Sequence, residues 1–337
     1  MTNTDEFTFL LSSDRSGSNL CLRLLDAHSD FCAPPTSQLF PVMTKFLSNY
    51  ESLKTDDNWG ALIEDTSELH KAGYGQWKNY EDIQFLRLAN EERSLALILK
   101  TLYRAEAKAH HKSRLFVKLH KAYKYSNFLR ENFPNAKYIH LVRDPRDMAL
   151  SWKKTAGLRG GALRALNIWQ EEQAGLIKFC EHVSGEVIHV KYEDILLEQT
   201  RTLKRLCLFL GVNYDADMLE FHRKESNQRN AEKIAAWRNL AKPLNAKNHG
   251  KYKAELSDDE RHYAELKCRD EMKYFGYEFD YNFDGKTPDI NAIKARLEPL
   301  EPWEKKAYAD LPAQERENHA HMRRVISKIE NRVSKTH

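Results

Sequence analysis

The sequence predicts an α/β fold with a doubly wound, mainly parallel sheet that is flanked by helices. Two observations support this prediction. Short apolar runs rich in β-branched residues recur along the chain, and runs of this length suit strands buried on both faces of a parallel sheet. Helical patterns lie between the runs, and a strand–helix–strand order implies right-handed crossovers, which build a doubly wound fold.

Four segments are expected to form the strands. They are FTFLLS at residues 7–12, RLFVKLH at 114–120, AKYIHLV at 136–142 and GEVIHVKY at 185–192. Helical patterns follow the first strand, in NLCLRLLDAH, precede the second, over 91–112, and separate the second from the third, in KYSNFLREN. Another helix is expected after the third strand, in DPRDMALSWKK, because Asp144 and Pro145 are favourable residues at a helix start.

The other segments complete the expected architecture. Residues 36–90 contain aromatic, glycine and asparagine residues with little regular period, and we expect a substrate-side insertion of helices and loops there. After Tyr192 the pattern predicts one helix that Gly211 ends. Residues 212–256 are irregular, and a capped helix is expected to begin near Ser257.

Length fits one large domain with an extension. The chain has 337 residues, enough for one large α/β domain or two small ones. We expect residues 1–283 to form the main domain and residues 284–337 to form a C-terminal helical extension. The extension has a polar, basic helical pattern, and we expect it to pack through its stripe of Met, Val and Ile residues.

Charge and cysteine content exclude several classes of protein. A net charge of +4 without blocks of like charge argues against a dedicated nucleic-acid binder but suits a small anionic ligand. No apolar run is long enough to cross a bilayer, and the N-terminal run is too short for a secretion signal. The five cysteines form no C-x-x-C pair, which argues against a zinc site. We therefore expect a cytoplasmic protein with reduced thiols.

The loop after the first strand has the composition of an anion-binding site. In SSDRSGSNL, the residues Ser16, Gly17, Ser18 and Asn19 are small or hydrogen-bonding, and Arg15 adds a fixed positive charge. The loop would open a helix at the carboxyl end of a strand, where free N–H groups and the helix dipole attract anions. Taken alone, the loop is equally compatible with an ordinary serine-capped turn.

This loop is not a Walker A motif. That motif has a lysine directly after its second glycine, whereas Ser18 follows Gly17 and the cation, Arg15, lies two residues before it. A loop this short is expected to hold one phosphate rather than a triphosphate. The third strand also ends in Arg143 before Asp144, and a cation at that position repels Mg²⁺ and attracts phosphate.

A second phosphate site is expected at the end of the third strand. Arg143 lies at the strand end and Ser151 lies about two turns into the following helix, so that both can meet one phosphate. Arg146 and Asp147 are expected to form a surface ion pair of little energetic value. Two phosphate sites at neighbouring strand ends would fit a mononucleotide with phosphates at both ends of its ribose.

These motifs resemble those of the sulfotransferases that use 3′-phosphoadenosine 5′-phosphosulfate (PAPS), a family with a P-loop-like fold. DRSGSNLCLRLLDAH resembles their 5′-phosphosulfate loop, and YIHLVRDPRDMALSW resembles their 3′-phosphate motif. VKYEDILLEQTRTLKRLCLFLGV and LAKPLNAKNHGKYKAELSDDE are similar to two further segments of the family, in the family order. The resemblance runs from residue 7 to about residue 280 and leaves the C-terminal extension uncovered.

The resemblance implies roles for individual residues. Arg15 and Leu20 are closer to the carbohydrate and protein-tyrosine branches, because the small-molecule branch often has a lysine and an adenine-stacking aromatic residue at these positions. The implied donor-binding residues are Ser16, Gly17, Ser18 and Asn19 for the 5′-phosphosulfate, Arg143 and Ser151 for the 3′-phosphate, Tyr192 near the adenine or its ribose, and Lys247 or Lys251 from the closing segment.

The second strand carries a candidate for the general base. Lys118 and His120 alternate at a period of two, so they leave the strand on one face. His120 can take a proton near neutral pH, and small-molecule sulfotransferases have a similar Lys-x-His whose histidine is the base. The protein-tyrosine branch uses a glutamate after the first helix, but no Asp or Glu lies between Phe31 and Phe40. The structural alternative for His120 is a strand-end histidine bonded to a loop carbonyl.

The predicted enzyme moves a sulfuryl group from PAPS to a hydroxyl, or less readily an amine, of a small-molecule or carbohydrate acceptor. His120 would be the base, Arg15 and Lys118 would stabilise the leaving group and the sulfuryl oxygens, and Ser151 would link the 3′-phosphate site to Arg15. No metal would be required. Glu64 and Asp65, in the insertion, are fallback bases.

Two alternatives to a sulfotransferase remain at this point. They are a P-loop kinase that uses ATP and Mg²⁺ and a non-catalytic nucleotide-binding protein on the same scaffold. The sequence identifies neither the acceptor nor the oligomeric state. The insertion and residues 155–170 would shape the acceptor pocket, and the aromatic residues that either line it or pack in the core are Tyr50, Trp59, Tyr74, Trp77 and Trp169.

Overall fold

The core of the protein is a five-stranded parallel sheet. A computed structural model describes residues 7–73, 77–78, 83–88, 92–183, 185–233, 235–282, 288–298 and 310–332. Within these residues the strand order is β2-β3-β1-β4-β5, and every pairing is parallel. The predicted doubly wound, mainly parallel sheet is confirmed. The strands are β1 Phe7–Ser12, β2 Phe31–Cys32, β3 Arg114–Leu119, β4 Lys137–Val142 and β5 Val187–Lys191.

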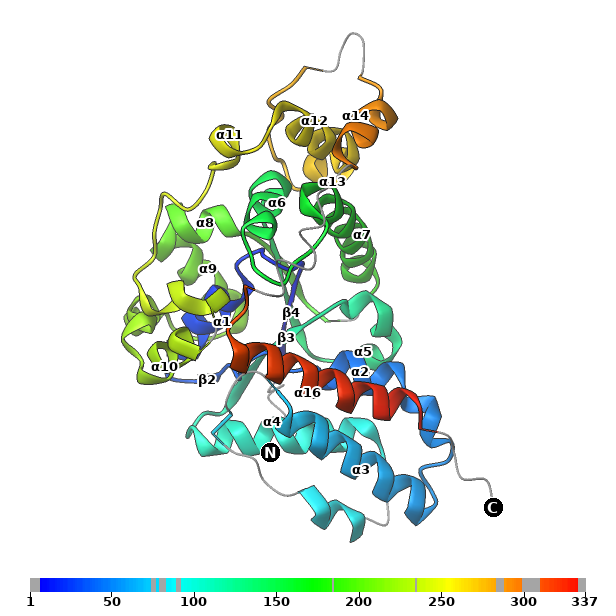
Figure 1. Ribbon diagram of the computed structural model, residues 1–337. Helices are drawn as coiled ribbons and strands as arrows, with labels where there is room; N and C mark the ends of the chain where they lie inside the picture. Colours follow the sequence, from blue (N-terminus) through cyan, green and yellow to red (C-terminus); the bar gives the residue numbers. More distant parts are fainter. Residues whose placement is uncertain are drawn as a thin grey trace.

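Helices surround the sheet (Figure 1). The α-helices of the described residues are α1 Ser18–Ala27, α2 Leu39–Lys45, α3 Asp56–Lys71, α4 Leu95–Ala109, α5 Ser126–Asn132, α6 Pro145–Lys153, α7 Gly161–His182, α8 Tyr192–Leu197, α9 Gln199–Leu210, α10 Glu225–Lys233, α11 Tyr252–Glu255, α12 Asp258–Lys267, α13 Arg269–Tyr274, α14 Ile290–Leu297 and α16 Ala313–Glu330. The 3₁₀ helices are η1 Leu47–Tyr50, η2 Ile83–Leu88, η3 Ala122–Tyr125, η4 Ala216–Arg223 and η5 Ala235–Ala241.

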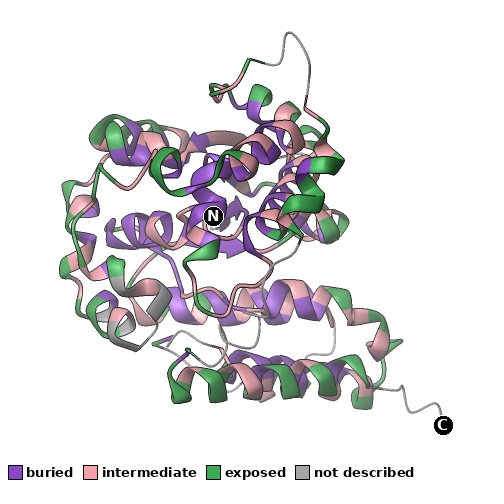
Figure 2. Cartoon of the chain, turned by 45° about the horizontal axis from the view of Figure 1, so that its top comes forward, coloured by how far each residue is buried: buried purple, intermediate pink, exposed green. Residues whose placement is uncertain are grey.

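Strand β1 shows why the sheet needs apolar residues on both faces. Phe7, Phe9 and Leu11 pack in one hydrophobic cluster with residues of α2, α3 and α4. Leu10 packs in a second cluster with residues of α1, α8 and α9. Because successive side chains of a strand point to opposite faces, a strand between two helical layers must be apolar at nearly every position. Figure 2 shows buried residues along the sheet and on the helix faces turned toward it.

Several elements differ from the sequence prediction. Strand β2 has only two residues, too few for a pattern to reveal. The sequence did not predict helix α7, because a glycine pair such as Gly160 and Gly161 is typical of a loop. The two glycines, at the start of this helix, have φ of 79° and 55°. The helix expected after Tyr192 is interrupted at Glu198, and the helix expected from Ser257 is interrupted at Cys268.

The expected helix signals at Gly211 and Ser257 are confirmed. Gly211 ends α9 with φ of 71°. Ser257 begins α12 through a capping box, in which its hydroxyl accepts from the Glu260 N–H and the Glu260 carboxylate accepts from the Ser257 N–H. Local capping chemistry therefore sets these boundaries.

Helix α16, in the predicted extension, packs on the insertion against α3, whereas α14, in the same predicted extension, packs on α12 (Figure 1). Met322, Val325 and Ile329 of α16 are buried in the cluster that contains the insertion, so the expected apolar stripe is confirmed. Arg332 donates to both carboxylate oxygens of Asp65, with a distance of 2.8 Å from Nη2 to Oδ1. These contacts hold α16 and the residues after it against α3.

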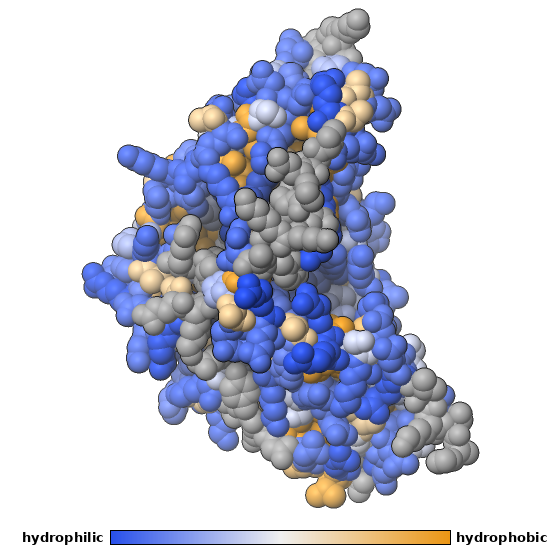
Figure 3. All heavy atoms as spheres, viewed as in Figure 1, coloured by the Kyte–Doolittle hydropathy of each residue, from blue (hydrophilic) through white to orange (hydrophobic). Residues whose placement is uncertain are grey.

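The surface carries few apolar groups on the side shown in Figure 3. Most residues there are hydrophilic, and the hydrophobic ones form small, separate groups. In the described part of the chain, no helix combines the length and the apolar composition that a membrane span requires.

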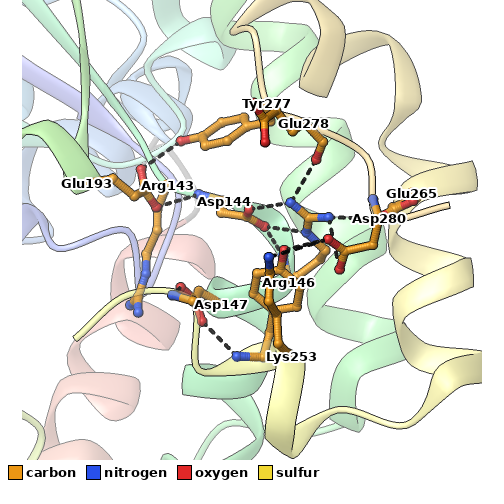
Figure 4. A network of polar contacts seen from close by, with 12 residues as sticks. Arg143, Asp144, Arg146, Asp147, Glu193, Lys253, Glu265, Tyr277, Glu278 and Asp280 are labelled. Carbon is orange, nitrogen blue, oxygen red and sulfur yellow. Dashed lines mark hydrogen bonds and ion pairs between the residues drawn. The ribbon is translucent and has the colours of Figure 1, made fainter. Parts of the chain in front are cut away.

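The predicted surface ion pair between Arg146 and Asp147 is wrong. Arg146 is only 3% exposed, and its Nη2 lies 2.7 Å from Asp144 Oδ2. Its Nη1 also pairs with Glu265 and lies 3.5 Å from Asp280 Oδ2 (Figure 4). The prediction failed because two of these partners lie far along the chain, where spacing gives no signal. Arg146 is instead the centre of a buried ion network.

We expect Arg146→Met to lower the free energy of unfolding by about 3–5 kcal/mol, because it leaves buried carboxylates without their cation. Urea denaturation followed by circular dichroism measures this loss. The control is Arg201→Met, since Arg201 pairs with Glu198 at the surface with 82% of its side chain exposed. Its loss should cost less than about 1 kcal/mol. Equal losses in the two variants would contradict the expectation.

Candidate active site

The carboxyl ends of β3, β1, β4 and β5 are neighbours, and the predicted site residues follow these strands. Residues 13–17 follow β1, His120 follows β3, Arg143 follows β4 and Tyr192 follows β5. Ligands of open parallel sheets bind beyond this edge. The strand order therefore brings residues 13–17, His120 and Arg143 to the same edge of the sheet.

The loop after β1 is tightly wound against Tyr192. Arg15 has φ of 62° and Gly17 has φ of 87°, so both have left-handed backbone. A Cβ at Gly17 would lie 2.2 Å from Tyr192 Cδ2. Position 17 therefore requires glycine for its backbone angle and for its contact with the ring.

Two buried donors at this loop are unpaired within the described part of the chain. Ser16 Oγ and Arg143 Nε are buried and make no hydrogen bond to any described residue. A buried polar group left unpaired costs about 1–3 kcal/mol. These donors and the N-terminus of α1, which begins at Ser18, fit a bound phosphate or sulfate group.

Arg15 and Arg143 lie next to each other although both are cations. Arg143 Nη1 donates to the Arg15 carbonyl oxygen at 3.0 Å. Arg15 Nε donates to Ser151 Oγ at 3.2 Å. Burial lowers the pKa of Arg15, and the charge of Arg143 lowers it further. Because the two like charges repel each other and lose hydration, an anion between them would stabilise both.

The chain after η5 passes over Arg143. Arg143 Nη2 donates to the Asn248 carbonyl oxygen at 3.4 Å. The Arg143 guanidinium lies 4.6 Å from the centroid of the Tyr192 ring. Asn248 Nδ2 in turn donates to the Tyr192 hydroxyl at 2.8 Å. The segment thus forms one wall of the same site.

Asp147 anchors this closing segment to α6. Its carboxylate accepts hydrogen bonds from the backbone N–H groups of Gly250 and Tyr252. Of the two predicted cations, Lys251 donates through Nζ to the side-chain oxygen of Asn248 at 2.9 Å, and Lys247 is exposed. The segment that carries both lysines is therefore held over the site by a buried carboxylate.

His120 faces Asp14 rather than a loop carbonyl. His120 Nδ1 lies 3.8 Å from Asp14 Oδ1. The pKa of His120 is lowered to about 4, mainly by burial and in addition by the charge of Lys118, while the charge of Asp14 opposes this shift. Lys118 is buried nearby; burial lowers its pKa and Asp14 raises it. The imidazole is therefore neutral at pH 7 and has a lone pair that can accept a proton.

Other predicted residues lie outside this cluster. Leu20 packs on the cluster around α1, and Asp65 is paired with Arg332. Tyr74 lies outside the described residues. Among those residues no group of three or more His, Cys, Asp or Glu side chains could hold a metal ion. The remaining aromatic candidates are buried in hydrophobic clusters rather than at a pocket: Tyr50, Trp59, Trp77 and Trp169.

The sequence interpretation missed three residues of the site. Asp14 directly precedes Arg15, and a carboxylate inside a cationic loop was a usable signal. Asn248 and Asp147 gave no such signal. Their contacts join positions 105 residues apart, in Arg143 to Asn248, and 103 residues apart, in Asp147 to Gly250.

Comparison with known proteins gives a family and a fold. A model described as the sulfotransferase family matches residues 8–216. The sulfotransferase domain of the Synechococcus PCC 7002 olefin synthase is 21% identical with a TM-score of 0.57, covering 83% of this chain and 97% of that chain. The sulfotransferase domain from the curacin biosynthetic pathway is 17% identical with a TM-score of 0.54, covering 81% and 98%.

Two nematode proteins are similar in sequence, and both have protein-tyrosine sulfotransferase in their names. The protein from Caenorhabditis briggsae is 24% identical over 229 residues, or 66% of this chain and 71% of that protein. Protein-tyrosine sulfotransferase A from Caenorhabditis elegans is 23% identical over 253 residues, or 72% of this chain and 60% of that protein. The chain thus spans less than two thirds of the second relative.

We expect Gly17→Ala to destabilise the protein more than Gly211→Ala, by at least about 1 kcal/mol. Both glycines have positive φ, 87° and 71°, so both variants carry backbone strain. Only the Cβ at position 17 meets Tyr192, whereas nothing lies within 4 Å at Gly211. Urea denaturation of the two variants measures the difference. Equal midpoints would show that the Tyr192 ring moves aside without cost.

Proposed function

This chain belongs to the sulfotransferase family, and we propose that it transfers a sulfuryl group from PAPS to a hydroxyl of a small-molecule or carbohydrate acceptor. One observation carries the proposal. The two predicted phosphate sites are in contact, because Arg15 donates a hydrogen bond to Ser151 and Arg143 donates one to the Arg15 carbonyl oxygen. A ribose with a phosphate at each end requires two such phosphate sites side by side.

The sulfuryl donor, PAPS, would contact both phosphate sites. The 5′-phosphosulfate would accept hydrogen bonds from the Ser16 hydroxyl and from N–H groups at the start of α1, in residues 17–19. The 3′-phosphate would lie at Arg143, whose Nε is the unpaired donor, and at Ser151. Tyr192 lies between Gly17 and Arg143, which would place it beside the nucleoside. Lys247 and Lys251 remain the candidates for the closing cation.

In the proposed step the acceptor oxygen attacks sulfur while the bond from sulfur to the 5′-phosphate oxygen breaks. His120 takes the acceptor proton on Nε2, because Nδ1 faces Asp14, and Asp14 stabilises the imidazolium that forms. The electron pair of the broken bond moves to the phosphate oxygen, where Arg15 and Lys118 stabilise the charge. The products are the sulfated acceptor and 3′-phosphoadenosine 5′-phosphate (PAP).

The proposed acceptor class follows from the base. No carboxylate lies between Phe31 and Phe40, where the protein-tyrosine branch would have one, so His120 remains the candidate. The names of the nematode relatives make a peptide tyrosine the competing acceptor, and tyrosine peptides belong in any acceptor screen.

The five cysteines are free thiols, which supports a cytoplasmic location.

PAP is expected to stabilise the protein without metal. At about 100 times its dissociation constant, PAP should add about 2.7 kcal/mol to the apparent stability. Thermal unfolding with PAP and with ATP and Mg²⁺ measures this, and Arg143→Ala should abolish the effect of PAP. If ATP with Mg²⁺ stabilised the protein and PAP did not, the kinase alternative would replace the proposed function.

His120→Ala is expected to lower sulfuryl transfer by about 10²–10⁴-fold while PAP binding persists. Labelled PAPS with phenols, sugars, amines and tyrosine peptides as acceptors measures the transfer, and calorimetry measures PAP binding. Because the pKa of His120 is about 4, its protonation should reduce the wild-type rate only as the pH falls toward 4. An unchanged kcat in His120→Ala would remove His120 from the mechanism.

A further inference from the structure

A chain of buried polar groups runs beneath the loop after β1. Gln173 Nε2, on α7, donates to Ser13 Oγ at 2.7 Å. Gln173 Oε1 lies 2.9 Å from His140 Nε2, on β4. His140 Nδ1 lies 3.2 Å from His189 Nδ1, on β5. Ser13, Gln173 and His140 are all buried, so this chain ties the loop to the sheet and to α7.

The chain fixes the direction of the Ser13 hydroxyl. Burial lowers the pKa of His140 to about 3, so the imidazole is neutral. Because Gln173 Oε1 can only accept a hydrogen bond, the ring nitrogen that faces it, Nε2, carries the proton and donates. The amide nitrogen of Gln173 therefore faces Ser13 and donates to its oxygen. The Ser13 proton is left to donate to the carboxylate of Glu172, the neighbour of Gln173 on α7.

Glu172 lies between the two loops of the site. Its Oε1 lies 3.9 Å from the Nζ atom of Lys121, which is the residue after His120. Its hydrogen-bond partner is Ser13, which is the residue before Asp14. Its Oε2 is buried without a partner among the described residues. The other charged and titratable groups that face Glu172 are Asp14 after β1, Lys118 on β3, Tyr123 on η3 and Glu171 on α7.

These surroundings decide the charge of Glu172. The pKa of Glu172 is raised to about 7, mainly by burial and in addition by the charge of Asp14. Lys121 and the hydrogen bond with Ser13 lower it, but they do not outweigh burial. Glu172 therefore gains its negative charge as the pH rises through 7, and only then attracts the Lys121 ammonium.

We propose that Glu172 is a positioning residue of the active site. The ionised carboxylate holds the Lys121 ammonium and the Ser13 hydroxyl together, and so sets the distance between the donor loop and His120. The protonated carboxyl loses its attraction to Lys121, and the turn that carries His120 is no longer fixed. This inference rests on the proposed function, because the alignment concerns the acceptor oxygen, sulfur and His120 in the transfer step.

The test is the pH profile of PAPS turnover in Glu172→Gln, which keeps the size of the side chain and removes its ionisation. Labelled PAPS is supplied with water as the acceptor, so that the assay requires no identified acceptor. The wild-type rate should rise about tenfold from pH 6 to pH 8, as expected for ionisation of one group with a pKa of about 7. The rate of Glu172→Gln should stay near the wild-type rate at pH 6 throughout this range.

Glu171→Gln is the matched control. Glu171 is the adjacent residue on α7, its side chain is 64% exposed, and it pairs with Lys124 at the surface. This variant should follow the wild-type profile. Calorimetry should give PAP affinities within about twofold for the wild type and both variants.

Three outcomes would overturn the inference. A wild-type pH profile in Glu172→Gln would show that Glu172 does not act on the rate. Loss of PAP binding together with a lower melting temperature in Glu172→Gln would show a purely structural role. A wild-type protein that neither binds PAP nor turns over PAPS would overturn the proposed function itself, and the role of Glu172 with it.

Discussion

The geometry of the site depends on the guanidinium of Arg143. It donates to the carbonyl oxygen of Arg15 in the loop after β1 and to that of Asn248 in the closing segment, and it lies over the Tyr192 ring after β5. Three segments that are distant in sequence therefore meet at one planar, rigid group. A lysine could not make these contacts together, because its ammonium is a point charge on a flexible stem.

The position of Arg143 is fixed by the network behind it (Figure 4). Trp169 Nε1 donates to the Arg143 carbonyl oxygen at 3.2 Å. The next residue, Asp144, caps α6, and its N–H donates to Glu193 at 3.0 Å. Arg146 holds the Asp144 carboxylate from the other side. Buried ion networks are weak sources of stability because their charges lose hydration, so we attribute the value of this one to the alignment of the strand end.

The residues at the strand ends could be predicted from the sequence, but most of their partners could not. The runs that became β1, β3, β4 and β5 and the small residues 16–19 are local signals, and the strand order then brings their ends together. The partners of these residues come from elsewhere: Asn248 from a segment without regular period, and Glu172 from α7, whose glycine-rich start concealed a helix. Contacts of this kind depend on tertiary packing, for which residue spacing along one chain carries no information.

The contact between Asp65 and Arg332 has a consequence for the nascent chain. Helix α3 leaves the ribosome 267 residues before the arginine that neutralises its buried carboxylate. At about 5–20 residues per second, this delay is on the order of tens of seconds. A carboxylate without its counter-ion resists burial, so we expect α3 to bury Asp65 only after Arg332 has left the ribosome. A ribosome that stalls between Asp65 and Arg332 would therefore carry a chain whose insertion lacks this ion pair.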